Sequence, residues 1–207
     1  MTAVRLVVAS MNPHKRDELA ALLRLDGVEL VGLAGFAGAT APVEDGATLI
    51  ENARIKARAA VRLTGLPAIA DDTGLEVDAL DGRPGVHAAR YAGPGATYAD
   101  NVAKLLAELR GIPPERRTAR FRTVCVACGP DGGEAVGEGV LEGRITDVPR
   151  GGFGFGYDPV FEVQEPGAGA RTLAELPADE KNASSHRARA VRDVTAPLLA
   201  LLAPHRG

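Results

Sequence analysis

The sequence predicts an α/β fold in which helices flank a mixed β-sheet. In the first half of the chain, short apolar stretches bounded by turn-forming residues alternate with stretches whose apolar residues recur at helical spacing. Further along, two stretches rich in β-forming residues, 120–128 and 134–145, flank the glycine-rich turn 129–133. This arrangement predicts an antiparallel hairpin, so the sheet is expected to be mixed rather than wholly parallel.

Length and composition match an ordinary globular domain. The 207 residues predict a single domain over 1–207, because domains cluster near roughly 100–200 residues. The net charge of −3 argues against a surface that binds nucleic acid. No apolar run approaches the roughly 18 residues of a membrane span. The N-terminus lacks the apolar core of a signal peptide, so we expect a cytoplasmic protein without a membrane partner.

The first strand is predicted over residues 4–9, which are mostly apolar. Asn12 is a favoured helix N-cap, and Pro13 suits the first helical position. A stripe of leucines then marks a helix, which we expect to end at Gly27.

The first turn of this helix carries three successive basic residues, His14, Lys15 and Arg16. Cations are unfavourable at a helix N-terminus, where the backbone already presents partial positive charge. Their concentration there favours an anion site, for which phosphate is the usual ligand. The alternative is a basic surface turn moderated by Asp17 and Glu18.

A second helix is predicted from its two ends. Thr48 and Glu51 have the spacing of a capping box, and Gly65 is placed to end the helix. Glu44 and Asp45 lie just before this helix, where carboxylates are electrostatically favoured. That position alone explains the presence of both carboxylates without a functional role.

The most informative stretch is 67–74, Pro-Ala-Ile-Ala-Asp-Asp-Thr-Gly. It predicts a buried strand that ends on Asp71 and Asp72, with residues 75–80 as a separate half-buried segment. Ligands bind at strand ends in α/β folds, and adjacent carboxylates repel unless a cation or a proton donor lies between them. We therefore expect a divalent metal site suited to Mg²⁺. A solvated acidic turn is the alternative.

Two further helices are predicted towards the C-terminus. One is capped by Thr97 and ends at Gly111. The last begins after Ser184 or Ser185, either of which suits the cap position. Pro197 should kink or split this last helix.

The cysteines Cys125 and Cys128 form a C-x-x-C pattern that we do not interpret as a redox or zinc site. Three residues along a strand span roughly 10 Å and reverse the side-chain face, whereas a disulfide allows a Cα separation of only about 7 Å. The chain has no second cysteine pair to complete a zinc site. We expect both to be small buried core residues.

Two stretches near the C-terminus suggest ligand contacts. Glycines and aromatics alternate in 151–159, which favours a slot for a planar ring with Asp158 as a polar contact. The alternative is an aromatic loop that closes one edge of the core. Ser185, His186 and Arg187 could present a hydroxyl, an imidazole and a guanidinium to one ligand; His186 as a plain surface residue is the alternative.

Taken together, these motifs resemble the inosine/xanthosine triphosphate pyrophosphatase family, whose members hydrolyse non-standard purine nucleoside triphosphates. The resemblance covers nearly the whole chain and keeps the order of the motifs. The motifs are Ser10-x-Asn12-x-x-Lys15, Glu44-Asp45-Gly46-x-Thr48-x-x-Glu51-Asn52-Ala53, Ala70-Asp71-Asp72-Thr73-Gly74-Leu75, Gly82-x-Pro84-Gly85-x-x-x-Ala89-Arg90-Tyr91, Gly154-Phe155-Gly156-Tyr157-Asp158-Pro159-Val160-Phe161 and Glu180-Lys181-x-x-x-Ser185-His186-Arg187.

The resemblance implies a long mixed sheet in two lobes with the active site in the groove between them, usually in a homodimer. It implies Mg²⁺-dependent hydrolysis of ITP, dITP or XTP to the monophosphate and pyrophosphate. Asp72 would be the catalytic carboxylate and, with Glu44, a Mg²⁺ ligand, while Asp71 is either a second ligand or a residue that contacts the ligands of the metal without binding it. The substrate-binding residues would be Ser10, Met11, Asn12, Pro13, His14 and Lys15 at the triphosphate, Thr73, and Phe155, Gly156, Tyr157, Asp158, Lys181, His186 and Arg187 around the purine.

The chain departs from the family pattern at four positions. Met11 and His14 replace frequent glycines, Thr73 replaces a usual serine, and Ala89 replaces a serine before the Arg-Tyr pair. None of these changes removes a charged group from the implied site, so they bear on its geometry rather than on the reaction.

Two other functions stay open at this point. One is a pyrophosphatase of the related Maf-like group that acts on pyrimidine nucleotides, against which the motifs around Tyr157 and His186 argue. The other is a nucleotide-binding module without turnover, which the intact set of Lys15, Glu44 and Asp72 makes a weaker hypothesis.

Overall fold

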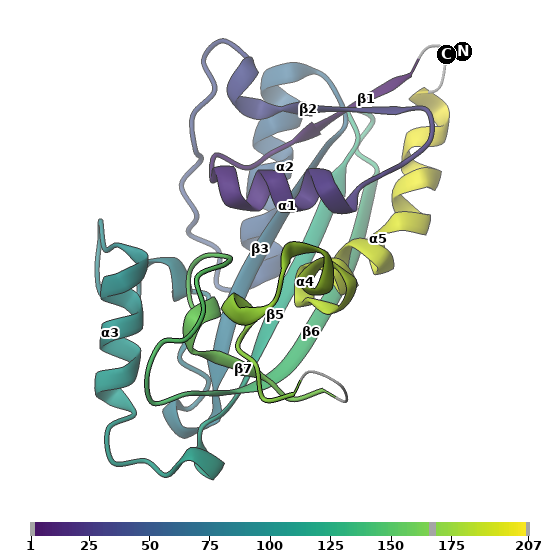
Figure 1. The fold of residues 1–207 in the computed structure, drawn as a ribbon. Helices are drawn as coiled ribbons and strands as arrows, with labels where there is room; N and C mark the ends of the chain where they lie inside the picture. The colour runs from purple at the N-terminus through teal and green to yellow at the C-terminus, as the bar shows by residue number, and fades with distance from the viewer. Residues whose placement is uncertain (1–2, 166–168, 206–207) are drawn as a thin grey trace. The chain divides into compact units, whose positions relative to one another are not determined.

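A computed structural model describes residues 3–165 and 169–205 (Figure 1). The N-terminus, which is predicted to lack a signal peptide, begins with Met1 and Thr2, and these two lie outside the described residues. Short 3₁₀ turns join the main elements. These are β1 (Val4–Val8), α1 (Pro13–Leu22), β2 (Val28–Gly32), α2 (Leu49–Thr64), β3 (Ala68–Val77), β4 (Pro84–Gly85), α3 (Tyr98–Glu108), β5 (Thr118–Cys128), β6 (Glu134–Ile145), β7 (Phe161–Val163), α4 (Ala178–Ser184) and α5 (His186–Leu202).

The strands pair in the order β2-β1-β3-β5-β6-β7, with β4 paired to β3. β1 is parallel to both β2 and β3. The β3–β4 and β6–β7 pairs are antiparallel. The predicted α/β fold with a mixed sheet is therefore confirmed.

The chain divides into two compact units. Unit 1 comprises residues 1–72, 123–139 and 187–207, and unit 2 comprises 73–122 and 140–186. Each unit buries a hydrophobic core of its own, one built on β1 and α5 and the other on α3 and β7. The chain passes from one unit to the other directly after Asp72 and directly after His186.

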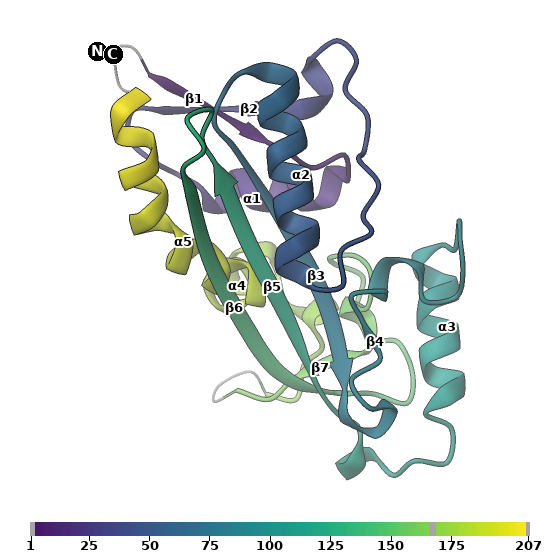
Figure 2. The same ribbon diagram turned by 180° about the vertical axis from the view of Figure 1, so that it is seen from behind.

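In unit 1, helices cover both faces of the sheet. α1 lies on one face and α2 on the other, as the two opposite views show (Figures 1 and 2). Leu19 of α1 and Val194 of α5 belong to the same buried cluster, so α5 packs on the α1 side. α2 buries an alanine stripe, Ala53, Ala57 and Ala60, which lets the helix approach the strands closely.

The ends of α2 agree with the prediction. Thr48 and Glu51 form the capping box, and Gly65 ends the helix in the left-handed conformation at φ 68°. The capping box of α3 at Thr97 is likewise present. These signals are local, so they do not depend on the rest of the fold.

The prediction that the strand ends at the two aspartates was wrong. β3 continues through Asp71, Asp72 and Gly74 to Val77 as one strand. Its second half pairs with β4 through Leu75 and Glu76. The carboxylates do not need a solvated strand end because neighbouring cations neutralise them within the sheet, as described below.

Three other expectations need correction. α1 ends at Leu22 and not at Gly27, which instead lies in the turn before β2 at φ 72°. The strand β2 was not predicted. The helix α4 was also not predicted, and Ser185 separates it from α5. Pro197 lies inside a continuous α5, so it does not split the helix, and the alternative of a kink stays a prediction.

Cys125 and Cys128 are both buried and both free thiols. The prediction that the C-x-x-C pattern is not a disulfide is confirmed. Within the part of the chain that the structure describes, no helix has the length and apolar character needed to cross a membrane.

The contact between β6 and α5 in unit 1 depends on Gly137. A Cβ added there would lie 2.3 Å from the backbone nitrogen of Val194. We predict that Gly137→Ala lowers the free energy of unfolding by about 1–3 kcal/mol, since overpacking forces backbone shifts. Urea denaturation measures this loss. The control is Gly35→Ala, where a Cβ meets nothing within 4 Å; an equal stability of the two variants would contradict the packing argument.

Candidate active site

The residues predicted to bind a nucleotide fall into two groups, one in each unit. Unit 1 holds residues 10–15, Glu44, Asp72 and Arg187, and unit 2 holds the others.

The loop after β1 is organised by Asn12, the N-cap of α1. Its side-chain oxygen accepts hydrogen bonds from the backbone nitrogens of His14 at 3.0 Å and Lys15 at 3.4 Å. The Ser10 hydroxyl donates to the Asn12 carbonyl at 3.4 Å. Of the successive basic residues, Arg16 pairs with Asp17 at 2.7 Å. The Lys15 ammonium instead lies 3.8 Å from Asp71 and 3.9 Å from Asp72.

Asp71 and Asp72 serve opposite faces of β3, because successive residues of a strand alternate in direction. Asp71 is bound by Arg187 of α5, through Nε at 3.1 Å and Nη2 at 2.9 Å. Arg187 also donates to Glu18 of α1. Asp72 is bound by Lys56 of α2 on the other face, at 2.8 Å.

Lys56 joins the two predicted metal ligands. Its ammonium lies 2.8 Å from Asp72 and 3.2 Å from Glu44, so the two carboxylates face a common point. No motif in the sequence singled out this lysine. The available signal was its position three residues after Ala53 and four before Ala60, at the margin of the buried alanine stripe.

The charges in this cluster hold one another in the ionised state. Burial by itself would raise the pKa of the Asp71 carboxyl, but the positive charges of Lys15, Arg187 and Lys56 outweigh it and lower that pKa well below its usual range. Burial would likewise lower the pKa of Lys56, but the surrounding carboxylates outweigh burial and raise it.

The two shifts have opposite consequences for stability. Because the folded-state pKa of Asp71 is depressed, its ionisation contributes stability above the ordinary value of 3.8, and this is lost as the pH falls through the lowered pKa. The contribution of Lys56 is complete below its ordinary value of 10.5 and is lost as the pH rises through the raised pKa. Both groups are therefore charged at neutral pH.

Arg187 was predicted to contact the purine. Its side chain is 2% exposed, and its guanidinium is held by Asp71 and Glu18 within unit 1. This placement favours a role in fixing Asp71 on β3 over direct contact with a base.

In unit 2, the glycine-rich loop closes on a buried ion pair. Asp158 accepts hydrogen bonds from the Lys181 ammonium at 2.7 Å and from the Phe155 backbone nitrogen at 2.9 Å. The Lys181 nitrogen also lies 5.2 Å from the centre of the Phe155 ring, within range of a cation–π interaction. Gly154 is required here, because a Cβ would lie 2.1 Å from Asp158 Oδ2.

Two other residues predicted to bind the purine are buried in unit 2. The Tyr157 hydroxyl donates to the Ala88 carbonyl at 2.9 Å, and burial raises the pKa of this phenol. The His186 ring stacks on Phe121 with centroids 4.6 Å apart. Thr73 is half-buried in β3. The structure thus brings Phe155, Asp158 and Lys181 together, whereas Tyr157 contacts Ala88 and His186 contacts Phe121.

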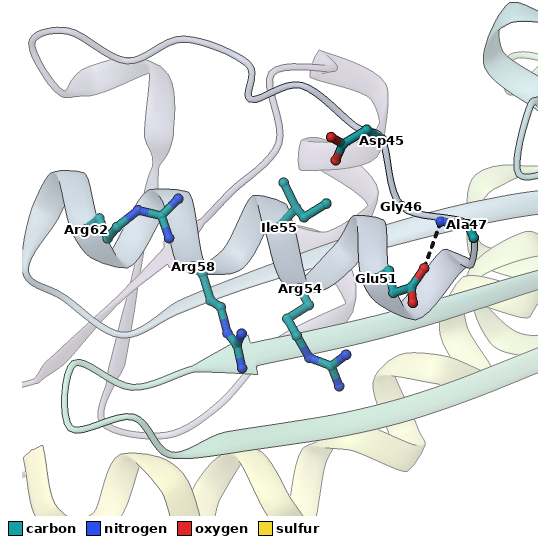
Figure 3. Close-up of a pocket in the computed structure, with 8 residues that line it drawn as sticks. All are labelled: Asp45, Gly46, Ala47, Glu51, Arg54, Ile55, Arg58 and Arg62. Atoms are coloured by element: carbon teal, nitrogen blue, oxygen red, sulfur yellow. Dashed lines mark hydrogen bonds between the residues drawn. The ribbon is translucent and has the colours of Figure 1, made fainter.

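A separate pocket of 630 Å³ lies along α2 in unit 1 (Figure 3). None of the predicted site residues lines it, although Asp45 follows Glu44 directly. Its arginines are partly neutralised, since Arg54 and Arg58 bind Glu134 at 2.7 Å and 3.3 Å. Among the described residues, no group of three or more His, Cys, Asp or Glu side chains could hold a metal ion.

Comparison with known proteins shows the family of this chain. The model of the Ham1 family matches residues 6–196. The chain belongs to the Ham1 family. A dITP/XTP pyrophosphatase of Geobacter sulfurreducens is 51% identical over 205 residues, which are 98% of this chain and 96% of that protein.

Solved structures of Ham1 proteins also match. A HAM1 protein from Coxiella burnetii shares 40% identity at a TM-score of 0.84, over 95% of this chain and 99% of that one. A nucleoside-triphosphatase / dITP/XTP pyrophosphatase from Mycobacterium abscessus shares 46% identity at a TM-score of 0.73 over the same shares. The resemblance inferred from the motifs is confirmed.

The buried pair of Arg187 and Asp71 should matter for stability. We predict that Arg187→Leu lowers the free energy of unfolding by about 3–5 kcal/mol, because it leaves a buried carboxylate without its main partner. Urea denaturation at neutral pH measures the change. The exposed Arg192 of the same helix provides the control, since Arg192→Leu should stay within about 0.5 kcal/mol of wild type. Equal losses in both variants would contradict the role given to the pair.

Proposed function

We propose that this Ham1 protein hydrolyses the non-standard purine nucleoside triphosphates dITP, XTP and ITP to the nucleoside monophosphate and pyrophosphate. The observation that carries the proposal is the convergence of Glu44 and Asp72 on one ammonium group, with Lys15 beside them. Such a cluster of carboxylates and cations suits phosphoryl chemistry, which depends mostly on positioning and electrostatics. The names of the relatives support the substrate class.

We propose Mg²⁺ as the cofactor, held by Glu44 and Asp72. Both carboxylates lie within 3.2 Å of the same ammonium nitrogen, so they already face one cation. Their oxygens are the ligands that Mg²⁺ prefers, and proteins commonly hold Mg²⁺ with one or two carboxylates plus substrate phosphates. When bound, the ion would neutralise phosphate charge and polarise a phosphoryl oxygen.

The remaining chemistry falls to residues of this chain. Lys15 and Lys56 offset the negative charge of the triphosphate, and residues 10–14 bind it at the start of α1. Asp72 accepts a proton from the attacking water. The water oxygen forms a bond to the α-phosphorus, the bond from that phosphorus to the α–β bridging oxygen breaks, and pyrophosphate leaves.

We propose that the purine is bound in unit 2 by Phe155, Gly156 and the Lys181 ammonium. Lys181 would donate a hydrogen bond to the 6-oxo group, with Asp158 fixing its position. Adenine has an amino group at that place, which cannot accept the hydrogen bond from the ammonium, so ATP would lose this contact. Thr73, Tyr157 and His186 stay predicted members of this group, and the homodimer, the cytoplasmic location and the lack of nucleic-acid binding likewise stay predictions.

A panel of nucleotides tests the proposal. Pyrophosphate release should be rapid with dITP, XTP and ITP, and kcat/KM for ATP should be lower by at least about 100-fold. Chelation of divalent cations should abolish turnover. Faster cleavage of pyrimidine triphosphates would favour a Maf-like enzyme instead, and tight ITP binding without pyrophosphate release would favour a binding module.

Variants of the unit 1 cluster test the assigned roles. We predict that Asp72→Asn lowers kcat by about 100-fold or more, because it removes the proton acceptor. Lys56→Met should lower kcat/KM by about tenfold or more, since a charge-assisted contact to phosphate is lost. Arg62→Met, an exposed position on the same helix, is the control and should leave the kinetics within twofold. An Asp72→Asn protein with near wild-type turnover would defeat the assignment.

A further inference from the structure

Tyr98 is an aromatic residue with no role in the proposed function. It is the first residue of α3 in unit 2, and its side chain is 40% exposed. Its ring lies against Phe155, with centroids 5.8 Å apart and planes inclined by 43°. Aromatic rings at this separation attract one another in a tilted arrangement.

The ring of Phe155 needs neighbours to hold it. Phe155 stands between Gly154 at φ 73° and Gly156 at φ 66°, neither of which has a side chain to support it. Its backbone nitrogen is tied to Asp158. The Phe155 ring lies 5.2 Å from the Lys181 ammonium and packs against the ring of Tyr98. Lys181 belongs to α4 and Tyr98 to α3, so two separate helices of unit 2 reach this ring.

The backbone that carries Tyr98 is firmly placed. Thr97 and Asp100 form a capping box around it, with Thr97 N–H donating to Asp100 at 2.8 Å. The buried Asn101 accepts from the Ala92 nitrogen at 2.7 Å and donates to the Ala89 carbonyl at 3.2 Å. The backbone of Tyr98 therefore has a fixed position, and the residue is still 40% exposed.

We propose that Tyr98 is a base-binding residue that holds the Phe155 ring and extends the aromatic surface receiving the purine base. This inference rests on the proposed function, in which Phe155 and Lys181 bind the base. A base stacked on Phe155 would also contact the ring of Tyr98, whereas the triphosphate would make no contact with that ring. Tyr98 should therefore affect affinity for nucleotides and leave the chemical step unchanged.

Steady-state kinetics of pyrophosphate release from dITP and XTP test this role. Tyr98→Ala should raise KM by three- to tenfold with kcat within twofold of wild type. Tyr98→Phe, which keeps the ring, should restore KM to within twofold. Leu63→Ala in unit 1, at a side chain 43% exposed, is the matched control and should change neither constant.

Inorganic triphosphate has no base, so its binding shows whether Tyr98→Ala weakens binding of the base alone or disturbs the whole site. Its inhibition constant should be the same for wild type and Tyr98→Ala. Equal weakening of nucleotide and inorganic triphosphate, or an unchanged KM in Tyr98→Ala, would overturn the inference while leaving the proposed function intact. A wild-type protein without pyrophosphate release would overturn both.

Discussion

The ion pair of Asp71 with Arg187 is the contact on which the arrangement of unit 1 depends. Asp71 lies in the middle of β3, its side chain is 0% exposed, and the guanidinium that binds it comes from α5. A buried carboxylate is costly unless it is paired and hydrogen-bonded. Since Arg187 also binds Glu18 of α1, one guanidinium fixes both helices of this face against the strand.

Adjacent carboxylates can occupy a strand interior because the strand separates them. Asp71 points to the face of α1 and α5, and Asp72 points to the face of α2, so each meets its own cation. Lys15 lies within 3.9 Å of both carboxylates and offsets part of their charge. The alternation gives the two residues different neighbours: Asp71 is hydrogen-bonded to Arg187, and Asp72 lies beside Lys56, which also contacts Glu44.

Features that depend on neighbouring residues could be predicted from the sequence, and features that depend on distant ones could not. The caps of α2, the free cysteines and the hairpin follow from local patterns. The full length of β3 did not, because two of the cations that allow Asp71 inside a sheet, Lys15 and Arg187, lie more than fifty positions away in the sequence. Lys56 was missed because its partners Asp72 and Glu44 lie outside its own helix.

The motif that ends in Ser185, His186 and Arg187 shows why adjacent residues in a motif need not share a ligand. His186 stacks on Phe121 in unit 2, whereas the next residue binds Asp71 in unit 1. The division falls between them, as it does between Asp72 and Thr73. Both motifs thus supply side chains to two separately packed cores. A substitution that alters either motif would therefore disturb packing as well as ligand contacts, and loss of activity alone would not reveal which of the two a residue serves.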